Sequence, residues 1–294
     1  TTGMFSVAIG AIANLILDPV FIFVFGLGIR GAAIATVLSQ ILSAAFVLYF
    51  LRKKTELKVR LLSGEEIHDC GRRAKNIISL GTAGFIMQLT NSLVTICCNN
   101  VLSVTGGDLY ISVMTIVSSI RQIIDTPIHA ITEGSSPVIS YNYGARRPKR
   151  VFQSWLTMSV MAILYTLLAW GVILFAPRFL IGIFSSDQAL ITDAIPALKL
   201  YFGAFVFQAL QYVGQTMFKS LGKKKFAIFF SLLRKVIIVV PLTYILPYLF
   251  HMGSDGVFLA EPVSNVLGGS ACFIVMLCTV MPELKRMAKE NSDC

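Results

Sequence analysis

Long apolar stretches alternate with short polar segments along the whole chain. A membrane hydrocarbon core of about 30 Å needs about 20 apolar residues in a helix, because each backbone amide must then bond within its own segment. Eight stretches meet that length, at about 3–25, 31–51, 77–103, 109–134, 153–176, 190–218, 226–250 and 257–281. The pattern predicts an all-α integral membrane protein, a polytopic bundle of about eight transmembrane helices.

Composition agrees with a membrane-embedded chain. Hydrophobic residues make up 55% and charged residues 14% of the 294 residues, whereas soluble domains carry about 25% charged residues. The net charge of +10 does not indicate nucleic-acid binding, since the basic residues lie between apolar runs and not on one soluble face. The six cysteines show no CxxC pair and no zinc-ligand spacing. No GxxxxGK[ST] nucleotide loop occurs, so ATP hydrolysis is not predicted and the chain is not expected to be an enzyme.

Basic residues predict the orientation, because short loops rich in Lys and Arg stay in the cytoplasm. Of the 25 Lys and Arg residues, 19 lie in the segments 52–75, 146–150, 219–225 and 285–289. The loops between these segments carry only Arg30 and Arg178. Every second loop is therefore basic. This alternation predicts that both ends of this multi-pass chain lie in the cytoplasm, and we expect the protein to lie in the plasma membrane.

An internal repeat predicts two homologous lobes. The stretch Gly31–Gln40 aligns without a gap on Gly256–Asn265, and each copy follows a helix that contains proline, Pro19 or Pro241. Both copies have the same predicted orientation, so they would be parallel repeats about an axis along the membrane normal. The predicted parts are the last two helices of an amino-terminal lobe (1–51) and a cytoplasmic linker (52–76). A carboxyl-terminal six-helix lobe (77–282) and a cytoplasmic tail (283–294) follow. A plan of six helices per lobe places four further helices before Thr1, so we expect the chain to be a fragment.

Ionisable side chains inside a bilayer are costly, so each is a candidate for function. Asp18 lies well inside the first predicted span, and Asn14 shares its helix face at a four-residue spacing. Pro19 lacks an N–H and frees the carbonyl of Leu15. The carboxylate, the amide oxygen and the carbonyl could together hold Na+, or the carboxylate could hold a proton. The alternative is that Asp18 lies near the outer interface and that Pro19 is only a structural kink.

A second polar stripe follows the predicted span 109–134, where Arg121, Asp125, His129 and Glu133 occur at four-residue steps. Arg121 and Asp125 could form an ion pair that lowers the cost of burying both charges. One interpretation makes the stripe the wall of a substrate cavity for cationic or zwitterionic ligands, or a proton path. The other makes it a lock between helices, with Glu133 solvated near the cytoplasmic end.

Amide side chains on two other spans are further candidates for the cavity wall. Gln208, Gln211 and Gln215 share one face of the span 190–218, and Gln88 shares a face with Asn91. Hydrogen bonding between membrane helices is the alternative use for such amides.

Glu261 occupies the repeat position of Thr36 and precedes Pro262. This position makes it a second candidate for a titrating group. Because it lies close to a predicted outer loop, we expect solvation to account for it.

Two motifs resemble a known transporter family. The run Asn14-Leu-Ile-Leu-Asp18-Pro19, followed by Gly31-Ala-Ala-Ile-Ala-Thr36, resembles the fifth and sixth helices of MATE (multidrug and toxic compound extrusion) transporters. The segment 137–145, Pro-Val-Ile-Ser-Tyr-Asn-Tyr-Gly-Ala, is followed by basic residues and resembles the eighth helix of that family and its cytoplasmic exit. The resemblance covers essentially the whole chain. It implies helices five to twelve of a V-shaped bundle with two six-helix lobes.

This resemblance implies secondary active efflux of cationic or amphipathic compounds in exchange for H+ or Na+, without a cofactor. It assigns cation coupling to Asn14, Asp18 and Thr36 and implies that Pro19 acts as a hinge when Asp18 binds the ion. The family's acid on the first helix is absent here, and the span 77–103 contains no Asp or Glu to match its carboxyl-lobe acid. The expected partners are a drug-like small molecule and the lipid bilayer, with no nucleic acid, and the protein is expected to be a monomer.

Two alternatives to drug efflux stay open. A flippase for lipid-linked oligosaccharides, of the same superfamily, would need a strongly cationic cavity, for which only Arg121 and Arg234 are available. A membrane scaffold without transport activity would need neither a buried Asp18 nor repeat symmetry.

Overall fold

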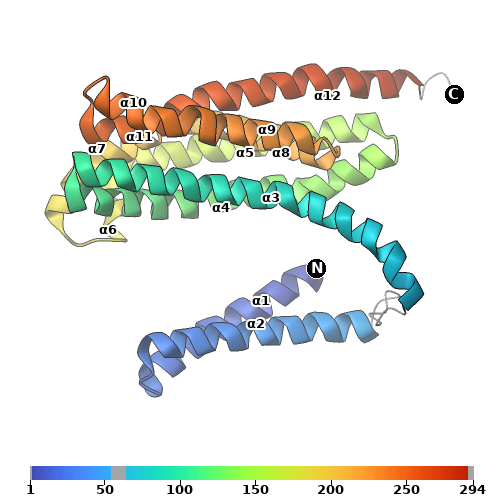
Figure 1. Cartoon of the computed structure of the whole chain (residues 1–294), viewed down its shortest axis with the longest axis horizontal. Coiled ribbons are helices and arrows are strands. Elements are labelled where there is room, and N and C mark those ends of the chain that lie inside the picture. Colours follow the sequence, from blue (N-terminus) through green and yellow to red (C-terminus); the bar gives the residue numbers. More distant parts are fainter. Residues whose placement is uncertain (1, 54–63, 291–294) are drawn as a thin grey trace. The chain divides into compact units, whose positions relative to one another are not determined.

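The computed structural model describes residues 2–53 and 64–290 of the chain (Figure 1). Across these two ranges the backbone is helical apart from short turns and contains no strand. It divides into two compact units, Thr1–Ala74 and Lys75–Cys294. The structure confirms the predicted all-α fold, and each of the eight predicted spans falls on helix.

The first unit contains a helical hairpin. Its elements are α1 (Thr2–Pro19), the π-helical turn η1 (Val20–Val24) and α2 (Gly28–Lys53). Gly26 and Gly28 form the tip with φ angles of +64° and +52°, a left-handed region that glycine adopts without steric cost. Ser43 ties the two arms together by donating a hydrogen bond to the carbonyl of Ser6 over 2.7 Å.

The second unit is a bundle of longer helices that lie side by side (Figure 1). Its elements are α3 (Gly64–Thr105), which enters this unit at Lys75, α4 (Gly107–Gly144), α5 (Pro148–Phe175), α6 (Pro177–Gly182), α7 (Gln188–Tyr201), α8 (Phe205–Ser220), α9 (Lys224–Leu232), η2 (Leu233–Val239), α10 (Val240–Tyr248), α11 (Gly253–Ser264), η3 (Asn265–Gly269) and α12 (Ser270–Glu290). The elements η2 and η3 are π-helical. Residues 64–76, predicted as part of the linker, are helical and begin α3, while residues 54–63 of that linker lie outside the described residues.

Five of the described helices are long and apolar enough to cross a membrane, or six if the bent pair of α7 and α8 counts as one span. The helices α3 and α4 are also long enough, with 42 and 38 residues. Of these two, α4 is less apolar than the five and carries the predicted stripe of charged side chains. A polar helix of this length needs partners inside the bundle, because lipid offers none.

The predicted span 190–218 is not one straight helix. It breaks between α7 and α8, whose axes differ by 50°. Gly203 lies in the break, where its N–H bonds the carbonyl of Leu200 at 3.1 Å and the N–H of Phe205 bonds that of Phe202 at 3.1 Å. In both hydrogen bonds the N–H group bonds the carbonyl three residues before it, which makes the turn tighter than in an α-helix. The break coincides with a glycine, a residue that stabilises a helix less than most others do.

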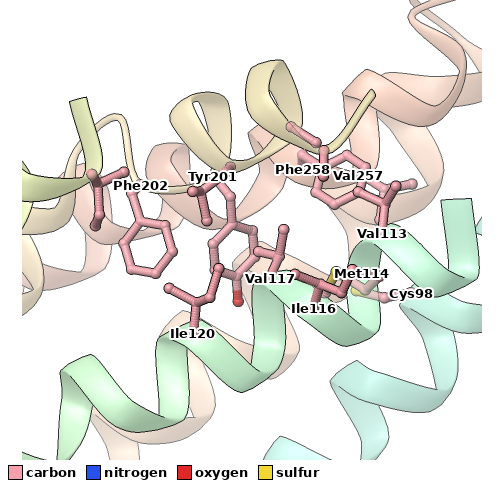
Figure 2. Packing of buried hydrophobic residues seen from close by; sticks show 14 of the residues in the cluster. Cys98, Val113, Met114, Ile116, Val117, Ile120, Tyr201, Phe202, Val257 and Phe258 are labelled. Atoms are coloured by element: carbon pink, nitrogen blue, oxygen red, sulfur yellow. The ribbon is translucent and has the colours of Figure 1, made fainter. Parts of the chain in front are cut away.

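Two apolar clusters fill the second unit. One joins α3, α4, α7 and α11 and includes Phe202 and Phe258 (Figure 2). The other joins α5, α8, α9 and α12 and includes Phe218 and Met276. Outward-facing apolar side chains stay exposed, as Leu168 in the middle of α5 does at 72%. A large apolar surface of this kind fits a lipid environment.

The repeat is visible in how the two hairpins pack. A Cβ atom on Gly31 would lie 2.6 Å from the carbonyl oxygen of Phe21, and one on Gly256 would lie 2.9 Å from the carbonyl carbon of Leu246 and 2.8 Å from the nitrogen of Pro247. In both hairpins the contacted carbonyl group belongs to the residue ten positions before the glycine. The aligned glycines therefore let the second helix of each hairpin touch the backbone of the first.

We expect Gly256→Ala to destabilise the second unit. The added methyl group meets backbone atoms that cannot move aside, and overpacking of this kind costs about 1–3 kcal/mol. Thermal unfolding in detergent should show a lower midpoint than for the wild type. The matched control is Gly171→Ala in α5, where a Cβ atom would meet nothing within 4 Å. If the two variants unfolded at the same midpoint temperature, the close approach of α11 to the backbone of α10 would be contradicted.

Candidate functional site

A group of charged side chains is buried between α4, α11 and η2. The Oε1 atom of Glu261 lies 2.7 Å from Arg121 Nη1, 3.2 Å from Arg234 Nη1 and 3.1 Å from Lys235 Nζ. Glu261 is only 3% exposed, and Arg234 and Lys235 are 5% and 7% exposed. We refer to Glu261, these three cations and Asp125 as the charged cluster.

The π-helical segments shape this cluster. Neighbouring residues on an α-helix point about 100° apart, yet Arg234 and Lys235 both bond Glu261 from the wider turn of η2. On the facing helix, Pro262 follows Glu261 and η3 begins three residues later at Asn265, whose side-chain oxygen accepts a hydrogen bond from Arg234. Isolated π turns occur frequently at functional sites, because they redirect side chains that a regular helix would hold apart.

Arg121 links the two carboxylates of the cluster. Its Nε atom lies 3.1 Å from Oδ2 of Asp125, which confirms the predicted ion pair along α4, while Nη1 reaches Glu261. Asp125 also accepts hydrogen bonds from the amide of Gln208 at 3.2 Å and from the hydroxyl of Tyr212 at 3.3 Å. The hydroxyl of Tyr201 accepts a hydrogen bond from Arg121. Several partners thus compensate the buried charges of Arg121 and Asp125, as burial in an apolar bundle requires.

A cavity of about 340 Å³ opens beside the cluster. Its wall carries Arg121, Asp125, His129, Tyr201, Arg234 and Lys235, together with hydroxyl, amide and apolar side chains of α3 and α4. Figure 2 shows Tyr201 reaching from α7 toward Val117 and Ile120 on α4, and this side chain belongs to the apolar cluster and also lines the cavity.

Of the side chains predicted to form the substrate cavity, Arg121 and Asp125 line this one. Gln208, behind Asp125, and Gln211 and Gln215 on α8 are buried, at 2%, 3% and 4% exposure, and do not line it. Gln88 is exposed on α3. Gln208 joins α8 to α4 through its hydrogen bond to Asp125, the alternative use considered for these amides, whereas Oε1 of Gln211 has no hydrogen-bond partner among the described residues.

The stripe on α4 divides into an inner and an outer part. His129 lines the cavity and stacks on Tyr212, with ring centroids 4.6 Å apart. Glu133, one turn further, is solvated and pairs with Lys219 over 3.1 Å, where both side chains are more than one third exposed. The stripe thus changes from cavity wall to exposed ion pair along its length.

The expectation of a solvated Glu261 is wrong. Gly256 lets α11 pack directly on the end of α10, and the two helices run back along each other, so Glu261 lies opposite the cations of η2. Sequence reasoning also missed Lys235, Tyr201 and Tyr212. Lys235 carried the clearest signal, because it stands beside Arg234 inside the predicted span 226–250 and a charge within a span indicates function.

The structure brings together two residues of the predicted coupling site in the first unit. The amide of Asn14 donates a hydrogen bond to Asp18 Oδ1 over 3.3 Å, and both side chains are half-buried. The wide turn η1 begins directly after Pro19. Thr36 is exposed, and its hydroxyl donates to the carbonyl of Ala32 in its own helix. The part of the chain that the structure describes holds no group of three or more His, Cys, Asp or Glu side chains suited to a metal ion, so Na+ at Asp18 would take mainly amide and carbonyl oxygens.

Comparisons with known proteins agree with this architecture. The family model named MatE matches residues 83–245. The multidrug export protein MepA of Staphylococcus aureus is 25% identical over 266 residues, which cover 90% of this chain and 57% of the relative. MepA of Staphylococcus saprophyticus is 24% identical over 276 residues, covering 93% of this chain and 59% of the relative. The chain thus spans little more than half the length of these curated relatives.

Solved structures show the same fold. A MATE structure in the bent conformation superposes with a TM-score of 0.82 at 23% identity and covers 99% of this chain and 63% of that one. The outward-facing conformation of a multidrug resistance MATE family transporter of the MOP superfamily gives a TM-score of 0.81 at 24% identity and covers 97% and 63%.

We expect Glu261→Ala to destabilise the second unit strongly. Removing one partner of a buried ion pair costs about 3–5 kcal/mol, and here three cations would lose their shared carboxylate. The comparison is Glu133→Ala, which removes an exposed pair worth about 0–1 kcal/mol. Denaturant unfolding in detergent micelles should separate the two variants clearly. If both unfold at the same denaturant concentration, the charged cluster does not hold the bundle together.

Proposed function

This chain belongs to the MatE family, and from that premise we propose that it forms the larger part of a secondary active transporter for multidrug efflux. The proposed cargo is cationic or amphipathic compounds, which leave the cell in exchange for H+ or Na+. We further propose a monomer in the plasma membrane with both ends of this chain in the cytoplasm. The export function named for the MepA relatives supports the proposal.

The observation that carries the proposal is the enclosure of ionisable side chains inside an apolar helix bundle. Glu261, Arg234 and Lys235 are each less than a tenth exposed, and Arg234 and Lys235 line a cavity. A bundle that only needed to be stable would do as well or better with apolar side chains at these positions. Polar groups kept at such a cost are typical of pathways for ions and substrates.

Asp18 is the proposed coupling residue. Its carboxylate would bind the proton or Na+, with Asn14 as its hydrogen-bonded neighbour. Pro19 and the wide turn η1 follow directly, so the helix is already weakened at the place where it would bend. Ion and drug must prefer different conformations of the transporter, because a ligand shifts a conformational equilibrium only by its difference in affinity for the two states.

One observation favours the flippase alternative. The cavity is more cationic than the sequence indicated, since Lys235 joins Arg121 and Arg234. Glu261 and Asp125 offset two of these three charges. A strongly cationic cavity for a diphosphate lipid is therefore not formed, and drug efflux is the better supported function.

We expect Asp18→Asn to abolish gradient-driven efflux. Asparagine keeps the size of the side chain but cannot carry the charge that binds a proton or Na+. The complete transporter that includes this chain is reconstituted in liposomes, and efflux of a fluorescent cation is measured under an imposed pH gradient and, separately, an imposed Na+ gradient. The rate should fall to that of empty liposomes under the gradient that drives the wild type.

The matched control for this assay is Asp187→Asn. Asp187 is exposed and caps α7 by accepting the N–H of Ala189 over 2.9 Å, a role that asparagine also fills. This variant should transport like the wild type. Unchanged efflux by Asp18→Asn would remove Asp18 from the mechanism.

A further inference from the structure

The charged cluster contains more positive than negative charge. Arg121, Arg234 and Lys235 are three cations, and Glu261 and Asp125 are two carboxylates. All five side chains are at most 14% exposed. An excess charge that is removed from water lacks compensation, so the cavity beside it favours a ligand group of the opposite sign.

Arg234 has a donor that no protein group uses. Its Nη1 atom serves Glu261 and Asn265, but its Nε atom is buried without a hydrogen-bond partner among the described residues. Leaving a buried donor unpaired is unfavourable, and the unpaired donors in native structures are therefore informative. The Nε atom itself is closed off from the cavity, but Arg234 lines it, so an acceptor placed there would meet other atoms of this guanidinium group.

The stem of Arg234 is held in place by a glycine. A Cβ atom on Gly268 would lie 2.9 Å from Cγ and 3.0 Å from Cβ of Arg234, so the side chain runs directly along the backbone of η3. This contact along the stem and the hydrogen bonds of Nη1 to Glu261 and Asn265 restrict the guanidinium group before any ligand binds. A pre-positioned guanidinium binds a planar anion with less loss of side-chain entropy than a free one would.

Lys235 adds a second donor to the same wall. Its ammonium group has three N–H bonds, and its hydrogen bonds run to the two oxygens of the single carboxylate of Glu261, at 3.1 and 3.4 Å. It therefore keeps capacity for another acceptor in the cavity. Guanidinium and ammonium groups side by side are the donors that bind a carboxylate most strongly.

We propose that this cavity binds the carboxylate of an amphipathic or zwitterionic compound through Arg234 and Lys235. The assignment rests on the proposed transport function and specifies, among its proposed amphipathic substrates, compounds that carry one acidic group. A single carboxylate neutralises the single excess charge of the cluster. Tyr201, Tyr212 and Met114 on the same wall would contact the apolar remainder of the compound.

The test is an equilibrium binding measurement with two matched probes. A fluorescent diethylaminocoumarin carboxylic acid and its carboxamide have nearly the same shape, but only the acid is charged at neutral pH. Binding to the purified complete transporter is measured in nanodiscs of phosphatidylcholine without any ion gradient. We expect the acid to bind about 10- to 100-fold more tightly than the amide, since charge-assisted hydrogen bonds contribute that factor.

Two substitutions should change this ratio in opposite directions. Arg234→Gln removes the excess charge and should bring the affinity for the acid down to that for the amide. Glu261→Gln releases three cations and should raise the preference for the acid above that of the wild type. Lys219→Gln, which alters an exposed ion pair, should leave the ratio unchanged. The amide also reports folding, because a collapsed cavity would lose both probes equally.

Clear results would overturn the proposal. Acid that binds no better than amide to the wild type, or a ratio that Arg234→Gln leaves intact, means that the cluster is only a lock between helices. Loss of acid binding when anionic phosphatidylglycerol replaces zwitterionic phosphatidylcholine means that an anionic lipid headgroup occupies the site. The proposed function is judged separately by gradient-driven efflux of a cation, so an exporter without any preference for the acid would disprove this inference alone.

Discussion

A carboxylate inside an apolar helix bundle stays ionised only where cations surround it, and Glu261 meets that condition with three. Its oxygen lies within 3.2 Å of Arg121 on α4 and of Arg234 and Lys235 on η2. The ion pairs draw three helices together at one point, and their geometry sets where the neighbouring cavity lies. Most other polar features of the second unit depend on this arrangement. Asp125, Gln208 and Tyr212 extend it, and the apolar clusters enclose it.

The close packing of α11 on α10 places Glu261 opposite Arg234 and Lys235 of η2. It depends on Gly256 at the start of α11, since any side chain there would meet backbone atoms of Leu246 and Pro247. The hairpin of the first unit uses the same device at Gly31. The first unit also places Gly10 of its first helix against Ser43 of its second. The second unit reverses this arrangement: Gly268 lies on the second helix of the hairpin, and the long side chain of Arg234 on the first helix packs against it.

The same alignment compares the chemistry of the two hairpins. Counted back from the aligned glycines without a gap, Asp18 falls opposite Thr243, which is fully buried and contacts Cys98 on α3 at 3.9 Å. Thr36 corresponds to Glu261. The acid thus lies on the first helix of one hairpin and on the second helix of the other, with the same glycine contact between the helices. One scaffold therefore carries two different charged sites, and we propose ion coupling at Asp18 and ligand binding in the second unit.

The sequence alone determined the helices and the local pairs. A membrane-spanning backbone must bond within its own segment, so long and largely apolar runs indicated the helical stretches, although one of them is broken between α7 and α8. The pairs Arg121–Asp125 and Asn14–Asp18 were predictable for a similar reason, since residues four apart share one face of a helix. Only the tertiary structure decided the burial of Glu261, its three cations, the unpaired Nε atom of Arg234 and the break at Gly203. These features depend on how closely separate helices approach, and that distance is set by small residues and packing far apart in the chain, which no local pattern records.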